Sequence, residues 1–201
     1  MAQGKFFVFE SIDGGGSETQ SKMFVRLLEE RGQAVLFLDY PDYDRPIGAF
    51  IHNYLHGNDH IPVDVKFILH SADKLKDREA VEQALADGKT VVACRYVTAM
   101  LAYQVVEGFD EAKALEHIRL MDFPVPDMTI YLKIRPETSK KRKLNEKGSL
   151  DRNESNIQLL SKVAARYEEM AKAGTFCRWA VIDGEKPADN VFKEVKKALG
   201  F

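Results

Sequence analysis

The sequence predicts an α/β domain built on five parallel strands, with helices on both faces of the sheet. Short apolar runs rich in Val, Ile and Phe alternate with longer segments of helical periodicity. Near-continuous apolar runs are typical of strands buried on both faces, and strand–helix–strand repetition favours parallel pairing through right-handed crossovers. The 201 residues carry no internal repeat, linker or break in composition, so we expect one domain, 1–201.

The strands are predicted from apolar runs that end at turn residues or polar residues. Each run is five to seven residues long, which suits a strand better than a helix. The predicted strands are, in order, 5–10, 34–39, 90–94, 128–134 and 178–182.

The helices are predicted from apolar stripes and end signals. In the first helical segment Phe24 and Leu28 lie on one stripe, and Gly32 follows as a stop signal. The second segment begins at Pro46, a residue favoured in the first turn. The third is a long pattern followed by Gly88. The predicted helices are 20–31, 46–55, 63–86, 111–121, 155–173 and 188–199.

The composition indicates which partners and which cellular compartment to expect. Hydrophobic residues make up 45% of the chain and charged residues 30%, which is typical of a folded globular protein. A formal net charge of −2 gives no reason to expect nucleic acid or an anionic membrane as a partner. Cys94 and Cys177 fit neither a disulfide framework nor a zinc pattern. With no signal-peptide core and no apolar run near the roughly 18 residues of a membrane span, we expect a cytoplasmic protein.

The first strand runs into a glycine-rich loop, FFVFESIDGGGSETQ, from Phe6 to Gln20. Ligands of parallel sheets bind at the carboxyl ends of the strands, and backbone N–H groups at a helix start form a nest for phosphate. In the phosphate-loop pattern Gly-x-x-x-x-Gly-Lys-Ser/Thr, read from Ser11, lysine and hydroxyl are replaced by Ser17 and Glu18. A glycine turn that merely joins strand to helix is the alternative interpretation.

A basic run, KKRKLNEK, spans residues 140–147. Such a run is usually a solvated helix face. A phosphate-binding role is the alternative interpretation.

Four further motifs follow the predicted strands or lie on the long helix. They are YPDY with PIGAFIHNYL (40–55), LHSADKLKDR (69–78), CRYVTAMLAYQ (94–104) and LDRNE (150–154). Together with the glycine loop, these motifs and their spacing resemble the thymidylate kinase family over nearly the whole chain. Members of this family are P-loop nucleoside monophosphate kinases that make dTDP from dTMP and ATP.

The resemblance implies a P-loop kinase-like three-layer α/β/α fold with a short lid at about 137–153. It also implies Mg²⁺ bound with ATP as cofactor, and a homodimer. Asp13 and Arg95 resemble the catalytic pair that contacts the sugar hydroxyl and holds the acceptor phosphate; Tyr103 resembles the aromatic that closes on the sugar. The implied phosphate loop consists of Gly14, Gly15, Gly16, Ser17, Glu18 and Thr19. The other implied monophosphate-binding residues are Arg45, His70, Lys74 and Gln104. The implied lid cations, which cover the ATP phosphates, are Lys140, Lys141, Arg142, Lys147 and Arg152.

The chain departs from the family pattern at charged positions. The aspartate of the family's Asp-Arg-Tyr is Cys94, and the arginine that reads the thymine carbonyl is Lys74. Glu18 replaces the magnesium hydroxyl and is itself a candidate metal ligand through oxygen. The sequence therefore predicts a dTMP kinase with an impaired ATP and Mg²⁺ site. A weak or inactive relative that binds a nucleotide or a protein partner remains the alternative, and a dimer subunit without ligand is a third.

Overall fold

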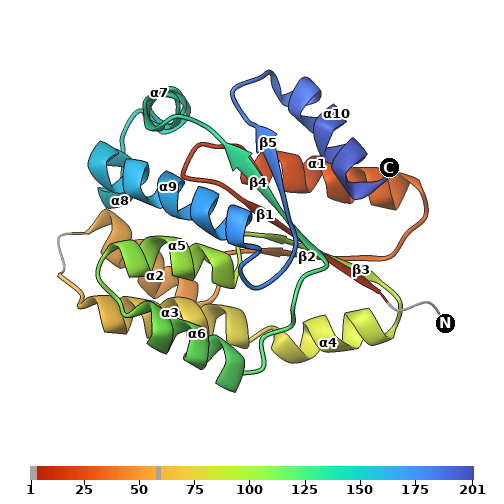
Figure 1. The fold of residues 1–201 in the computed structure, drawn as a ribbon, viewed down its shortest axis with the longest axis horizontal. Coiled ribbons are helices and arrows are strands. Elements are labelled where there is room, and N and C mark those ends of the chain that lie inside the picture. Colours follow the sequence, from red (N-terminus) through yellow and green to blue (C-terminus); the bar gives the residue numbers. More distant parts are fainter. Residues whose placement is uncertain (1–3, 58–59) are drawn as a thin grey trace.

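The computed structural model describes residues 4–57 and 60–201, and five strands form one parallel sheet in the order β2-β3-β1-β4-β5. The strands are β1 (Lys5–Glu10), β2 (Val35–Asp39), β3 (Thr90–Cys94), β4 (Met128–Lys133) and β5 (Trp179–Asp183). All five agree with the predicted strands within one residue at each end. The predicted three-layer α/β/α architecture is confirmed, and β1 lies at the centre of the sheet (Figure 1).

Helices cover both faces of this sheet. Helices α1 and α10 pack together on one face, while α4, α5 and α9 lie against the other, with α2, α3 and α6 outside them (Figure 1). The helices are α1 (Ser17–Glu30), α2 (Pro46–His56), α3 (Val63–Leu75), α4 (Arg78–Ala86), α5 (Val97–Val106), α6 (Glu111–Leu120), α7 (Pro136–Lys147), α8 (Arg152–Ser155), α9 (Ile157–Ala173) and α10 (Ala188–Leu199).

The single long helix predicted at 63–86 is wrong, because the chain breaks it into α3 and α4 at Lys76 and Asp77. Asp77 leaves helical geometry at φ −103° and ψ 1°. Its carboxylate accepts hydrogen bonds from Tyr40 Oη at 3.0 Å and Lys76 Nζ at 2.7 Å. Aspartate is favoured at the N-cap, where Asp77 lies, although here its carboxylate bonds to the side chains of Tyr40 and Lys76 rather than to the backbone of α4.

Helix α5 was not assigned from the sequence because it has no polar face. Eight consecutive residues, from Val97 to Gln104, are buried. A helix that is apolar all round gives no amphipathic stripe to detect. It follows β3 directly and carries the CRYVTAMLAYQ motif onto the sheet edge.

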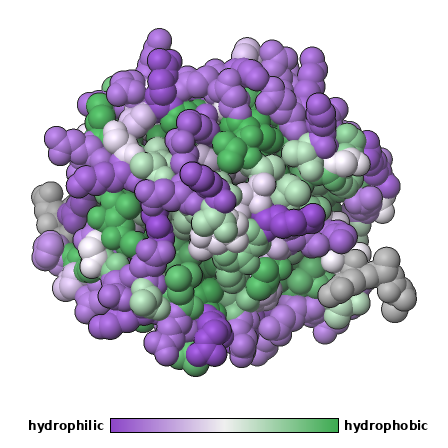
Figure 2. Space-filling view, viewed as in Figure 1, coloured by the Kyte–Doolittle hydropathy of each residue, from purple (hydrophilic) through white to green (hydrophobic). Residues whose placement is uncertain are grey.

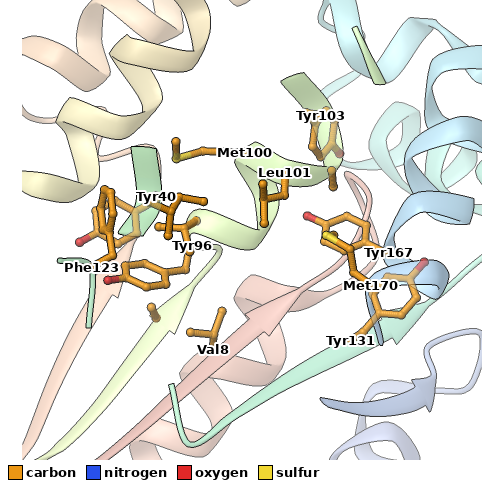
Figure 3. Packing of buried hydrophobic residues seen from close by; sticks show 14 of the residues in the cluster. Val8, Tyr40, Tyr96, Met100, Leu101, Tyr103, Phe123, Tyr131, Tyr167 and Met170 are labelled. Carbon is orange, nitrogen blue, oxygen red and sulfur yellow. The ribbon is translucent and has the colours of Figure 1, made fainter. Parts of the chain in front are cut away.

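The strand side chains alternate between two separate cores. Phe6 and Val8 of β1 belong to the core under α4, α5 and α9, whereas Phe7 and Phe9 belong to the core under α1 and α10. Figure 3 shows the first core, in which the Tyr131 and Tyr167 side chains lie near each other. Their rings stack at 5.0 Å.

The carboxylate of Glu10, at the end of β1, is completely buried in this core. Its Oε1 accepts hydrogen bonds from Tyr96 N at 2.9 Å and Thr98 Oγ1 at 2.6 Å, and its Oε2 accepts one from Tyr167 Oη at 2.8 Å. Burial raises the pKa of Glu10, although these bonds and the charge of Arg95 counteract that rise. One carboxylate thus joins β1, the start of α5 and α9.

The described helices include none that is long and apolar enough to cross a membrane.

We expect Glu10→Ala to lower the free energy of unfolding by about 3–5 kcal/mol, because three buried donors lose their acceptor. Glu10→Gln keeps one acceptor oxygen and should cost about 1–2 kcal/mol. Urea unfolding followed by circular dichroism measures both, with the exposed Glu29→Gln as the matched control. A loss below about 1 kcal/mol in Glu10→Ala would contradict the role of this carboxylate.

Candidate functional site

The glycine loop turns sharply from β1 into α1. Gly16 is the N-cap of α1 at φ 94°, in the left-handed region that disfavours other residues. The Gly15 N–H donates to the Ile12 carbonyl at 3.0 Å, which closes the turn. The first backbone N–H groups of α1 therefore lie at this turn, where the helix dipole favours an anion.

Ser11 stands where the phosphate-loop pattern has its first glycine, and its side chain has a structural role. Its Oγ is buried and donates to the Leu132 carbonyl of β4 at 2.7 Å. A Cβ added to Gly15 would lie only 1.6 Å from this oxygen. The hydroxyl fills the space behind the loop and requires glycine at position 15.

Asp13, Arg95 and Tyr103 form one network between β1, β3 and α5. Asp13 accepts from Arg95 Nη2 at 2.5 Å through Oδ1 and from Tyr103 Oη at 2.9 Å through Oδ2. The Arg95 backbone is in the left-handed region at φ 64°, and its N–H donates to Phe9. Left-handed backbone in a non-glycine residue is a strain that clusters at functional sites.

The protonated forms of Arg95 and Tyr103 are stabilised within this network. Burial opposes the positive charge of Arg95, but Asp13 together with Tyr103, Tyr167 and Glu10 raises the pKa of the guanidinium well above its usual value. Burial also raises the pKa of Tyr103, so its hydroxyl remains a donor. Arg95 thus presents a permanent, oriented cation at the end of β3.

A small cavity of about 70 Å³ lies on one side of Arg95. Its lining includes Asp13, Tyr40, His70, Lys74, Tyr103 and Gln104. The His70 ring nitrogen Nε2 is 2.7 Å from Tyr54 Oη, which fixes the ring. Burial lowers the pKa of His70 well below 6.5, and the charge of Lys74 lowers it further.

Lys74 is a buried cation at the base of the same cavity. Its Nζ donates to the His70 carbonyl at 3.2 Å and lies 5.1 Å from the centre of the Tyr40 ring. Burial lowers the pKa of Lys74 to about 8, although the Asp73 and Glu10 carboxylates raise it. The ammonium is therefore mostly charged at neutral pH but is close to its titration point.

A larger cleft of about 620 Å³ lies on the other side of Arg95, over the glycine loop. Of the predicted site residues, the structure brings Asp13, Gly14, Gly15, Gly16, Ser17, Glu18, Thr19, Arg95 and Arg142 together in its lining. Asp13 and Arg95 also line the small cavity, as does Tyr43, so the two cavities meet at the network.

Two groups at the strand ends beneath the loop, Cys94 and Asp39, have raised pKa values. Burial raises the pKa of the Cys94 thiol, and the neighbouring Asp39 carboxylate raises it further. Burial likewise raises the pKa of Asp39. Cys94 is therefore a protonated thiol, which is a poor ligand for Mg²⁺, whereas Asp39, Ser17 and Glu18 offer oxygen atoms in the same cleft.

Glu18 lies in the first turn of α1, and its carboxylate pairs with Lys22 at 2.5 Å. Hydrogen bonding to Glu18 raises the pKa of Lys22. The negative charge that replaces the loop hydroxyl thus has a cation beside it. Both side chains are about half exposed, so the pair contributes little to stability.

Helix α7 lies directly on the glycine loop. Ser139 Oγ donates to the Asp13 carbonyl at 2.5 Å, and Arg142 Nη1 donates to the Gly14 carbonyl at 3.5 Å. Arg142 Nη2 donates to the Gly184 carbonyl at 2.9 Å, after β5. The basic run is therefore part of the cleft wall as well as a solvated face.

Other predicted residues lie away from these cavities. Arg45 is exposed and Arg152 donates to the Gly57 carbonyl at 3.0 Å; in the described part of the chain neither belongs to the lining of the cleft or the small cavity. The side chain of Lys147 lies outside what the structure describes.

Sequence reasoning missed several residues of the cleft. They are Asp39, Tyr43, Lys143, Glu146, Asp151 and Glu154. Asp39 had a signal, since it ends a strand at the functional edge of the sheet. Asp151 and Glu154 form a capping box at α8, a pattern readable from their spacing. Lys143 and Glu146 line the cleft because of how α7 packs.

No group of three or more His, Cys, Asp or Glu side chains that could hold a metal ion occurs within residues 4–57 and 60–201. Two or three oxygen donors alone are still compatible with Mg²⁺, which keeps waters and substrate phosphates among its ligands. The oxygen donors of Ser17, Glu18 and Asp39 are therefore compatible with a Mg²⁺ ion whose other ligands are waters and nucleotide phosphates.

Comparison with protein families matches residues 9–195 to the family described as thymidylate kinase. The chain belongs to the thymidylate kinase family. It is 31% identical over 191 residues to a probable thymidylate kinase of Archaeoglobus fulgidus, covering 94% of this chain and 92% of that protein. It is also 31% identical to a thymidylate kinase of Bacillus pumilus (98% and 95% covered) and 27% identical to one of Danio rerio (96% and 89%).

We expect the protein to lose stability as the pH falls below 6.5 because of His70. Above that pH the imidazole is neutral in both states; below it, the unfolded chain binds a proton that the folded site refuses. The slope contributed by one such group is at most about 1.4 kcal/mol per pH unit.

Urea unfolding between pH 5 and 8 measures this slope. His70→Phe should flatten it in part, since the pKa of His117 is also lowered by burial. The exposed His60→Phe is the matched control and should leave the slope unchanged. An unchanged slope in His70→Phe would show that His70 is not the group responsible.

Proposed function

We propose that the protein is a nucleoside monophosphate kinase that transfers the γ-phosphoryl group of ATP to dTMP, with a weakened ATP and Mg²⁺ site. The observation that carries this proposal is that Arg95 lines both the cleft over the glycine loop and the small cavity. Phosphoryl transfer requires donor and acceptor phosphates to meet in line, and little covalent chemistry beyond that. A fixed cation between two adjoining cavities is suited to this task.

The acceptor side retains its polar groups. The dTMP phosphate would bind Arg95, whose planar donors suit an anion, and Asp13 would accept from the sugar hydroxyl. Tyr103 closes on the sugar. The base would enter the small cavity, where Lys74 and Gln104 offer donors to carbonyl oxygens and His70 offers a ring for stacking.

The donor side would hold ATP through backbone N–H groups of Gly14, Gly15 and Gly16 at the start of α1. The lid segment, 137–153 with Arg142, would cover the phosphates. Mg²⁺, when bound, neutralises charge on the transferring phosphates; Glu18 and Asp39 are the carboxylates that would support it. Ser17 stands where the family has its loop lysine, and Cys94 stands where the family has an aspartate. The donor side therefore lacks two charged groups, which is why we propose slow turnover.

A second candidate is an inactive relative that binds a nucleotide or a protein partner. The neutral Cys94 thiol and the pairing of Glu18 with Lys22 favour it, because both remove catalytic charge from the donor side. Two or three such losses, each worth about 10²–10³-fold, are enough to remove useful turnover. The acceptor cavity would still bind dTMP in this case.

The proposal also includes a homodimer in the cytoplasm. Phe50 of α2 and Ile68 of α3, on adjacent helices, are 51% and 53% exposed. Figure 2 shows green apolar patches in the lower part of the view, where Figure 1 has α3 and α6. A second copy of this chain is the occupant that family membership supports. The two free cysteines fit a reducing compartment.

The deciding measurement is steady-state turnover with ATP, Mg²⁺ and dTMP, run beside calorimetric titration of dTMP. We expect turnover at or below the roughly 1–100 s⁻¹ usual for kinases. Arg95→Ala should lower kcat/KM by at least about a hundredfold and abolish dTMP binding, while the exposed Arg26→Ala changes neither. dTMP binding without turnover would select the inactive candidate, and no binding of dTMP would reject both.

For the dimer, we expect Ile68→Glu to convert the protein to a monomer, because a buried unpaired charge opposes association. Light scattering during gel filtration measures the mass. Val125→Glu introduces the same charge at an exposed apolar position outside α2 and α3 and is the control. A parent protein that runs as a monomer at micromolar concentration would refute this part of the proposal.

A further inference from the structure

Two histidines lie next to each other on the solvent side of α2. His52 and His56 are four residues apart on this helix, and both are exposed. Side chains at this spacing lie on one face of a helix. Another face of α2 packs into the protein through Ile51, Tyr54 and Leu55, which are buried. The two imidazoles therefore stand on a helix that the core holds in place.

The two imidazole rings are already together. The centres of the His52 and His56 rings are 4.1 Å apart, and the ring planes differ by 21°. The edge of a third ring, that of Tyr43, packs against His52 at 5.1 Å. Because His52 has a ring on each side, little rotamer freedom is left to lose when both histidines bind one ion.

A backbone hydrogen bond fixes which nitrogen of His56 carries a proton. His56 Nδ1 lies 3.0 Å from the carbonyl oxygen of His52. A carbonyl oxygen only accepts, so Nδ1 is the donor, and in the neutral ring the lone pair is on Nε2. Metal-binding histidines usually have their other ring N–H held by a carbonyl or carboxylate in this way. His56 thus has the tautomer of a metal ligand.

Nitrogen ligands determine the class of ion that this pair suits. Imidazole suits Zn²⁺, Cu²⁺ and Ni²⁺, whereas Mg²⁺ prefers oxygen. Two histidines four residues apart on one helix face are the arrangement that binds zinc in metalloprotease helices. Within residues 4–57 and 60–201 no group of three or more His, Cys, Asp or Glu side chains could hold a metal ion, so water would complete the coordination. The Arg152 guanidinium, which donates to the Gly57 carbonyl at 3.0 Å, opposes a second cation at this helix end.

We propose that His52 and His56 form a binding site for one late first-row transition metal ion of the class of Zn²⁺, Ni²⁺ or Cu²⁺. Each ring supplies one nitrogen, which is Nε2 in His56. Neither histidine lines the cleft over the glycine loop or the small cavity. The proposal therefore does not rest on the proposed function.

Calorimetric titration of the full chain with NiCl₂ tests the proposal, in excess Mg²⁺ to occupy oxygen ligands. We expect one tight-binding ion per chain in the parent and at least about tenfold weaker binding in His52→Gln and in His56→Gln. Asn53→Gln on the same helix and His60→Gln, both at exposed positions, are the matched controls and should stay within about twofold of the parent. Circular dichroism should be the same for all four variants, since the exchanged side chains are exposed.

Binding to scattered imidazoles predicts a different result. His60→Gln would then weaken Ni²⁺ binding as much as His52→Gln does, and this outcome would overturn the proposal. A parent whose affinity is within about twofold of the double variant His52→Gln/His56→Gln would overturn it as well.

Electron paramagnetic resonance with one equivalent of Cu²⁺ gives an independent readout of the ligands. We expect coupling of the copper signal to two imidazole nitrogens in the parent and to one at most in His52→Gln or His56→Gln. A parent spectrum without coupling to imidazole nitrogen would reject the histidine pair as the site.

Discussion

The buried carboxylate of Glu10 is the interaction on which the rest of the site depends. It ends the central strand and accepts hydrogen bonds from the backbone of Tyr96 and from the hydroxyls of Thr98 and Tyr167. These bonds hold the start of α5 and the middle of α9 against the sheet. Because Arg95 precedes Tyr96, the same carboxylate fixes the left-handed turn that directs Arg95 toward Asp13. A buried charge is costly, and three donors to one group are what make it tolerable.

Compared with the family pattern, the cleft over the glycine loop keeps the loop backbone but has its charged side chains at different positions. Gly16 keeps the positive φ that starts α1, and Ser11 replaces a glycine but uses its hydroxyl to brace the loop against β4. At the charged positions the changes offset each other, since Ser17 and Cys94 remove one charge of each sign and Glu18 is accompanied by Lys22. Backbone geometry and side-chain charge are therefore separable parts of a phosphate site.

The acceptor side contrasts with this, because its polar groups bind one another as well as line a cavity. Asp13 accepts hydrogen bonds from Arg95 and Tyr103 together, so removal of Asp13 leaves the buried Tyr103 hydroxyl without this acceptor. Lys74 is held in the same region by the His70 carbonyl and the Tyr40 ring. Hydrogen bonding within the protein thus favours retention of these acceptor-side groups.

The sequence by itself determined the strands, the sheet class, the glycine loop and the family, because apolar runs and glycine positions are local signals. It also indicated that Asp13 and Arg95 belong to one site, since both follow strands whose ends meet at one edge. It did not determine the break at Asp77 or the helix α5, whose completely buried surface hides its period. Only the tertiary structure decided that α7 lies on the glycine loop and brings Lys143 over Gly14. The reason is physical: a charged helix has no apolar stripe from which its docking partner can be read, so packing alone decides where its cations lie.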